Sequence, residues 1–155
     1  MAKVVPNTKR AKRETVFPRL DFVTLFDVSI DIQPTDDPID SSLTYDVSIT
    51  PTAGSLEDKF TFRCHIAVGR KKKDSDENFI TIGASYGFLI DANELDEENL
   101  LHVAKLYAAT SVWSSFSSLF SVVSQQMKVE FPPLPTFPGN VRVQPDDEIA
   151  DEDEA

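Results

Sequence analysis

The feature that most constrains this chain is a long helical pattern from about Asp96 to about Met127. At 1.5 Å per residue such a helix extends roughly 45 Å, nearly twice an average globular helix. Asn93 and Asp96 suit the N-cap, and two consecutive prolines, Pro132 and Pro133, end any helix before them. The apolar residues keep a helical period: Leu100, Val103, Ala104, Tyr107, Val112, Phe116, Leu119, Phe120, Val123 and Met127.

The middle of this helix, from Ala108 to Ser124, places small residues between bulky ones. Serine is a mediocre helix former, but small side chains let another surface approach the backbone closely. One interpretation is a single contact with the chain's own sheet. We favour a second, in which another subunit also covers the helix, because one small domain seldom buries more than one stripe of so long a helix. The residues expected at that interface are Ala109, Val112, Trp113, Phe116 and Phe120.

Four segments before the helix alternate between apolar and polar residues, as strands with one buried face do. They run from about 20 to 33, 43 to 50, 59 to 70 and 78 to 91. The short connections favour an antiparallel meander. We therefore expect an α+β fold, a four-stranded antiparallel sheet with one long C-terminal helix packed on it. In the first strand, the apolar face is expected to carry Leu20, Phe22, Phe26, Val28, Ile30 and Ile32, and the solvent face Asp21, Asp27, Ser29 and Asp31.

Charge divides the chain into a core with two tails. Residues 1–16 form a basic tail and residues 144–155 an acidic one, both expected to be disordered, around a domain at 17–143. The net charge of −11 argues against a general nucleic-acid binder. No signal peptide pattern and no apolar run of membrane-spanning length are evident, so we expect a cytoplasmic protein without membrane insertion.

The chain offers little catalytic chemistry. Its single cysteine, Cys64, excludes an intrachain disulfide and a cysteine metal cluster, and the neighbouring His65 points to the other sheet face. His102 has no His, Asp or Glu three or four residues after it that would make a metal pair, and the glycines form no phosphate loop. We therefore expect no enzyme activity, no cofactor and no metal site. Binding is better supported, because Phe131 and Phe137 lie in the proline-rich segment after the helix, which either packs on its own core or lines an apolar groove for extended chains.

The order of elements resembles the SecB-like chaperones over about residues 17–143. The specific matches are Tyr86-Gly87-Phe88-Leu89, Leu95-Asp96-Glu97-Glu98 and, above all, Phe131-Pro132-Pro133-Leu134. The resemblance implies a homotetramer, a dimer of dimers with long helices between two sheets, that holds unfolded polypeptides without ATP. It also implies client-binding residues at Leu43, Tyr45, Val47, Phe131 and Leu134, to which we add Phe137 of the same proline-rich segment. In export members an acidic pair, matched here by Asp27 and Asp31, docks the SecA motor.

Two departures bear on the client. The segment Thr136 to Val143 is too short and proline-rich for the second helix of export members, and Ile82 stands where a SecA-docking glutamate is expected. They favour the relatives that protect the antitoxin of a toxin–antitoxin system. The alternative is an export chaperone that delivers preproteins to SecA and the Sec translocase. A small-ligand-binding α+β domain is the further alternative, disfavoured because the sheet face toward the helix carries almost no polar residue.

Overall fold

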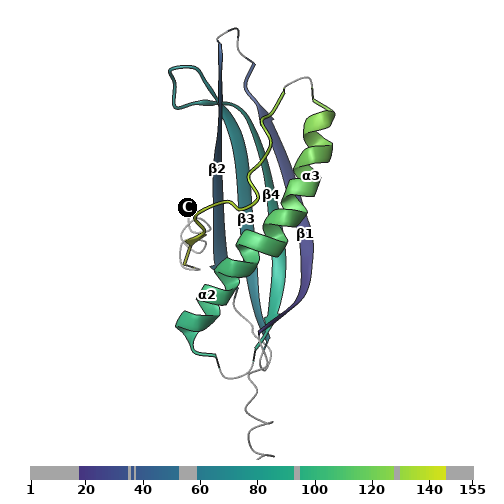
Figure 1. The fold of residues 1–155 in the computed structure, drawn as a ribbon, viewed down its shortest axis with the longest axis vertical. Coiled ribbons are helices and arrows are strands. Elements are labelled where there is room, and N and C mark those ends of the chain that lie inside the picture. The colour runs from purple at the N-terminus through teal and green to yellow at the C-terminus, as the bar shows by residue number, and fades with distance from the viewer. Residues whose placement is uncertain are drawn as a thin grey trace, which may run out of the picture.

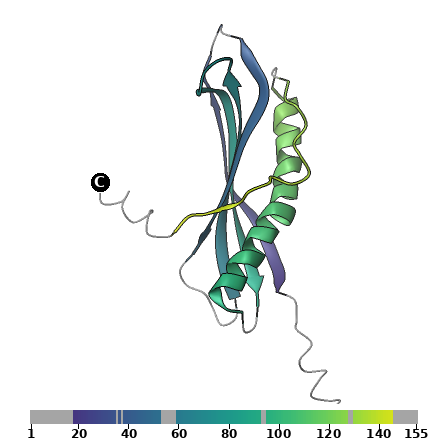
Figure 2. The same ribbon diagram turned by 60° about the vertical axis from the view of Figure 1, so that its left-hand side comes forward.

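The computed structural model describes residues 18–34, 36, 38–52, 59–92, 95–127 and 130–145. The basic tail, and the acidic tail from residue 146, lie outside the described residues. The molecule has two layers, a tall twisted sheet and one long helix that crosses one of its faces diagonally (Figures 1 and 2). This confirms the α+β class with a long C-terminal helix on one sheet face.

The sheet contains four long strands and one short one. They are β1 (Arg19–Ile32), β2 (Ile39–Pro51), β3 (Lys59–Lys72), β4 (Asn78–Asp91) and β5 (Arg142–Val143), in the spatial order β1-β4-β3-β2-β5. Only β2, β3 and β4 form a meander, so the four-stranded meander is wrong in one respect: β1 pairs with β4, at the edge of the sheet away from β2. Alternation along a strand does not specify its neighbour, so the predicted meander depended on the short connections alone.

Two register shifts divide β1 and reverse the direction of two of its aromatic side chains. The shifts lie between Leu20 and Phe22 and between Leu25 and Asp27. Because side chains alternate strictly along a strand, each extra residue moves the following ones to the other face. Phe22 and Phe26 therefore lie on the outer face, away from the helix, which corrects the expected pattern. The residues of β1 that face the helix side are Leu20, Val23, Leu25, Val28, Ile30 and Ile32.

The helix is continuous from Glu97 to Gln125 and consists of three parts. These are α2 (Glu97–Tyr107), a π-helical turn η1 (Ala108–Val112) and α3 (Trp113–Gln125). Asp96 caps the start as predicted, with its carboxylate accepting from the backbone N–H of Asn99 at 2.8 Å. Residues buried against the sheet recur every four positions: Leu100, Ala104, Ala108, Val112, Phe116 and Phe120.

The π turn explains how buried residues four positions apart stay on one side of the helix. In an α-helix with 3.6 residues per turn, a four-residue spacing drifts by about 40° per step. The wider π turn accommodates one extra residue and reduces that drift. The single stripe of buried residues can therefore follow the sheet over the full length of the helix.

Four of the five predicted oligomer-interface residues belong instead to the chain's own core. Val112, Trp113, Phe116 and Phe120 are buried within the chain, and only Ala109 is partly exposed. The exposed face carries serines and two large apolar residues, Leu106 and Val122. The sequence pattern located the helix correctly but placed the subunit interface on the side that packs against the chain's own sheet. The size of the side chains alone does not distinguish the two sides of the helix.

Candidate functional site: the helix-side face

The segment that follows the helix returns across the sheet between α3 and β2 (Figures 1 and 2). The centroids of its Phe131 ring and of the Phe120 ring are 5.1 Å apart, with the rings edge to face. The carbonyl of Pro135 accepts a hydrogen bond of 2.9 Å from the indole N–H of Trp113. β5 then adds to β2, where Arg142 pairs with Asp46, with 2.8 Å from its Nε to Oδ1. The segment therefore packs on its own core, whereas its role in a groove for extended chains stays a prediction.

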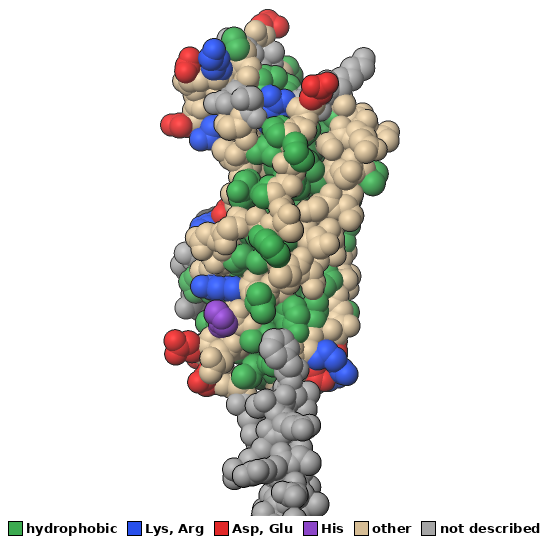
Figure 3. Space-filling model, in the orientation of Figure 1, with side chains coloured by type: hydrophobic (Ala, Val, Ile, Leu, Met, Phe, Trp, Pro, Cys, Tyr) green, Lys and Arg blue, Asp and Glu red, His purple; other side chains and the backbone are tan. Residues whose placement is uncertain are grey.

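The helix-side face carries a band of apolar side chains (Figure 3). Phe137 is 60% exposed, and Tyr45 is 42% exposed with its ring 5.9 Å from that of Trp113. Leu43, Phe131 and Leu134 are partly buried against the core. Val47 is only 1% exposed, so its side chain belongs to the core and offers no surface to a client. The structure thus places five of the six predicted client-binding residues at least partly at the surface.

A second part of this face was missed from the sequence. Leu25, Val28, Ile30 and Ile32 of β1 face the helix side, yet all four are exposed. The helix was expected to cover one sheet face, but the buried apolar residues of the strands belong to β2, β3 and β4, and much of β1 stays open. β1 is also an edge strand of the described sheet, and a long apolar edge is a ready template for pairing with another chain.

The outer sheet face carries the predicted acidic pair. Asp27 and Asp31 are both exposed and lie opposite Ser85 and Thr81 of β4. Phe22 and Phe26 lie beside them, and the Phe26 ring covers Gly87, where a Cβ atom would come within 2.2 Å of it. Ile82 is fully buried in the core and cannot occupy a surface docking position, so its match to the SecA-docking glutamate is wrong. The β4 residues next to the acidic pair are Ser85 and Thr81.

The described residues bring together little that could catalyse a reaction. Burial raises the pKa of the Cys64 thiol to about 12, so it stays protonated and unreactive at neutral pH. His65 lies on the opposite face, as predicted, with its Nδ1 3.2 Å from the Ser85 hydroxyl on an exposed, open surface. Within the described part of the chain, no three His, Cys, Asp or Glu residues are grouped closely enough to hold a metal ion. The described residues of the helix-side face therefore offer apolar contacts.

Comparison with known proteins identifies a fold and little more. No protein-family model matches the sequence. No curated protein matches it either. Among solved structures, the chain is similar to a SecB-like chaperone of Mycobacterium tuberculosis in complex with a ChAD peptide from the HigA1 antitoxin. The TM-score is 0.52 at 17% sequence identity, over 82% of this chain and 91% of the other.

Proposed function

We propose that this chain, which has the SecB-like chaperone fold, is an ATP-independent holdase that binds unfolded or aggregation-prone polypeptides. The observation that carries the proposal is the apolar band on the helix-side face, bordered by an extended segment and by exposed Tyr45 and Phe137. Exposed apolar surface of this kind marks sites that bind other polypeptides. A holdase needs an apolar surface that accepts clients of many sequences. The net charge of −11 keeps its complexes soluble.

An antitoxin is the client we favour. The structural neighbour is in complex with an antitoxin peptide, and the described residues 130–145 of this chain form no second helix of the kind expected of export members. A short extended apolar peptide would fit beside residues 130–141, whose four prolines cannot donate backbone hydrogen bonds. The client peptide would therefore be held mainly through side chains.

We also propose a homotetramer, a dimer of dimers. The helix is long and apolar enough to cross a membrane, with a mean hydropathy of 1.2. Core helices of soluble proteins can have the same length and hydropathy. Only 28% of its most apolar window is buried within this chain, and the partner subunits of the proposed tetramer would cover the rest. On the exposed side, several hydroxyls donate to helix carbonyls, as Ser115 does to Ser111 at 3.0 Å, so these donors stay paired if the face meets another surface.

The first test is suppression of aggregation of a denatured test protein, after light scattering has established the molar mass. The variant Phe137→Ser removes an apolar side chain from the proposed client surface. Its control is Phe26→Ser on the outer face, where exposure is a similar 62%. We expect Phe137→Ser to weaken suppression at least several-fold while the control leaves it unchanged. Equal activity of both variants would remove Phe137 from the site, and wild-type protein without suppression would refute the holdase.

A motor-docking role on the outer face is the second candidate. Asp27 and Asp31 project from the same exposed face of β1, where an acidic surface can attract a basic partner. If the chain serves export, Asp27→Lys with Asp31→Lys will reduce binding of purified SecA at low ionic strength by at least tenfold. An unchanged affinity would exclude this surface as the docking site.

A further inference from the structure

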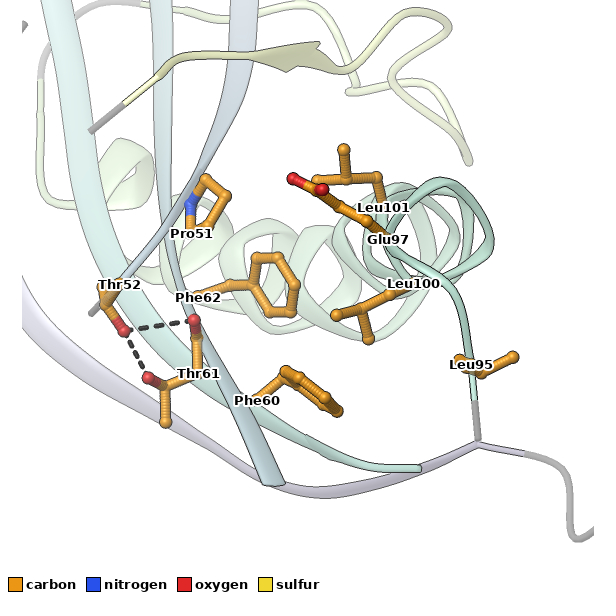
Figure 4. Close-up of a pocket in the computed structure, with 9 residues that line it drawn as sticks. All are labelled: Pro51, Thr52, Phe60, Thr61, Phe62, Leu95, Glu97, Leu100 and Leu101. Atoms are coloured by element: carbon orange, nitrogen blue, oxygen red, sulfur yellow. Dashed lines mark hydrogen bonds between the residues drawn. The ribbon is translucent and has the colours of Figure 1, made fainter. Parts of the chain in front are cut away.

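An apolar pocket opens between the start of the helix, the end of β2 and the start of β3 (Figure 4). Its volume is about 300 Å³, roughly twice that of a cavity that holds one benzene ring. The Thr52 hydroxyl donates to the Thr61 carbonyl at 3.1 Å and also contacts the Thr61 hydroxyl, so neither hydroxyl needs a further partner. The pocket therefore suits one large apolar side chain. Its apolar lining consists of Pro51, Phe60, Phe62, Leu95, Leu100 and Leu101.

A second hollow adjoins this pocket along α2. Leu101 lines both, so the two hollows meet at this side chain. Val143 of β5, which is 36% exposed, lines the second hollow from the side of the sheet. The described residues of α2 that line the second hollow are Glu98, Asn99, Leu101, His102 and Lys105.

Three residues of α2 form a row that runs from the first hollow to the second. Glu97, Leu101 and Lys105 are four positions apart, so they follow one another along one side of the helix. At 1.5 Å per residue, Glu97 and Lys105 are about 12 Å apart along the axis. Both are exposed, and within the described residues neither forms an ion pair. Figure 4 shows Glu97 extending from the helix toward Pro51, beside Leu101. The row thus presents an acid, an apolar side chain and a base in this order.

An extended peptide can match this row with alternate side chains. Residues i, i+2 and i+4 of an extended chain project from one face, about 6.6 Å from one to the next. The helix residues of the row recur every four positions, which is about 6 Å along the axis. A base at i therefore meets Glu97, a large apolar residue at i+2 enters the pocket beside Leu101, and an acid at i+4 meets Lys105.

The neighbouring edge of β2 offers such a peptide little backbone pairing. The Ile49 carbonyl already accepts from the N–H of Gln144 at 2.8 Å, and Pro51, two residues further along β2, has no N–H. A peptide that lies along α2 is therefore recognised by the order of its side chains, in either chain direction.

We propose that this row binds an extended segment in which a base, a large apolar residue and an acid occupy alternate positions, and that the segment belongs to the client. That the partner is a client rests on the proposed holdase function, whereas the charge order rests on the row itself. Exposed ion pairs are weak and are screened by salt, so the apolar side chain provides most of the affinity and the charges select among apolar segments.

Two fluorescein-labelled peptides of identical composition test the charge order. In the first, arginine, tryptophan and glutamate occupy positions 2, 4 and 6 of a seven-residue peptide that is otherwise serine. In the second, arginine and glutamate move to positions 3 and 5, on the opposite face of the extended chain from tryptophan. Fluorescence anisotropy with the full-length protein at low salt measures both affinities. We expect the first peptide to bind at least threefold more tightly, and 0.5 M salt, with a screening length of about 4 Å, to remove most of the difference.

Charge reversal in the protein provides a rescue test. Glu97→Lys should weaken binding of the first peptide at least threefold, and a third peptide, in which glutamate replaces the arginine, should recover that loss. Asp27→Lys is the matched control, because it makes the same charge change at an exposed position on the outer face. We expect the control to bind all three peptides as the wild type does.

The outcomes separate this inference from the holdase function. Equal affinities for the first two peptides, in a protein that suppresses aggregation, would overturn the inference and leave the holdase in place. Selective binding of the first peptide by a protein that does not suppress aggregation would refute the holdase but support the peptide site. If Glu97→Lys lowers the molar mass and leaves peptide binding unchanged, the row is a contact between copies of the chain, and the proposal is wrong.

Discussion

At the scale of single residues, Gly87 and Phe26 show how closely the outer face is fitted. A Cβ on Gly87 would lie 2.2 Å from the Phe26 ring, so any side chain there must push the ring aside. We predict that Gly87→Ala lowers the free energy of unfolding by about 1 kcal/mol, as overpacking typically does. Because the obstacle is the ring, the loss should shrink toward zero when Phe26→Ala is already present. Urea unfolding of the two single variants and the double variant measures this coupling; the same loss with and without the ring would show that Gly87 is needed for its backbone alone.

At the scale of elements, the π turn determines how the helix faces the sheet. Deletion of Thr110 removes one residue from η1 (Ala108–Val112) and should convert it to an α-turn while the buried stripe on either side keeps its direction. Deletion of Ser115, within α3, instead rotates Phe116 and Phe120 by about 100° away from the core. We predict a small loss of stability for the first deletion and a loss of about 3 kcal/mol or more for the second. Thermal unfolding distinguishes them, and equal losses would contradict this role of the π turn.

At the scale of the whole molecule, the exposed apolar side chains of β1 and the serine-rich exposed face of the helix are the two surfaces that the proposed tetramer would cover. If they form the proposed tetramer, Ile30→Asp on the helix side of β1 should reduce the molar mass measured by light scattering. Thr24→Asp on the outer face of the same strand is the matched control and should leave the mass unchanged. A buried unpaired charge is costly enough to separate subunits. A wild-type protein that is monomeric at micromolar concentration would remove both surfaces from any assembly.

Local pattern was sufficient for the elements themselves. Period-two alternation located the four long strands, and the cap at Asp96, the helical period and the prolines after it located the helix. The opposite orientations of Cys64 and His65 followed from alternation alone. These features depend on neighbours a few residues away, and the sequence by itself determined them.

The tertiary structure decided what depends on distant residues. The pairing of β1 with β4, the two register shifts that turn Phe22 and Phe26 outward, and the burial of Val47 and Phe116 all arise from contacts between segments far apart in the chain. So does the exposure of Ile30, because coverage depends on where the helix crosses the sheet. Apolar character is a property of a residue and can be read from the sequence, whereas its accessibility is a property of the packing around it.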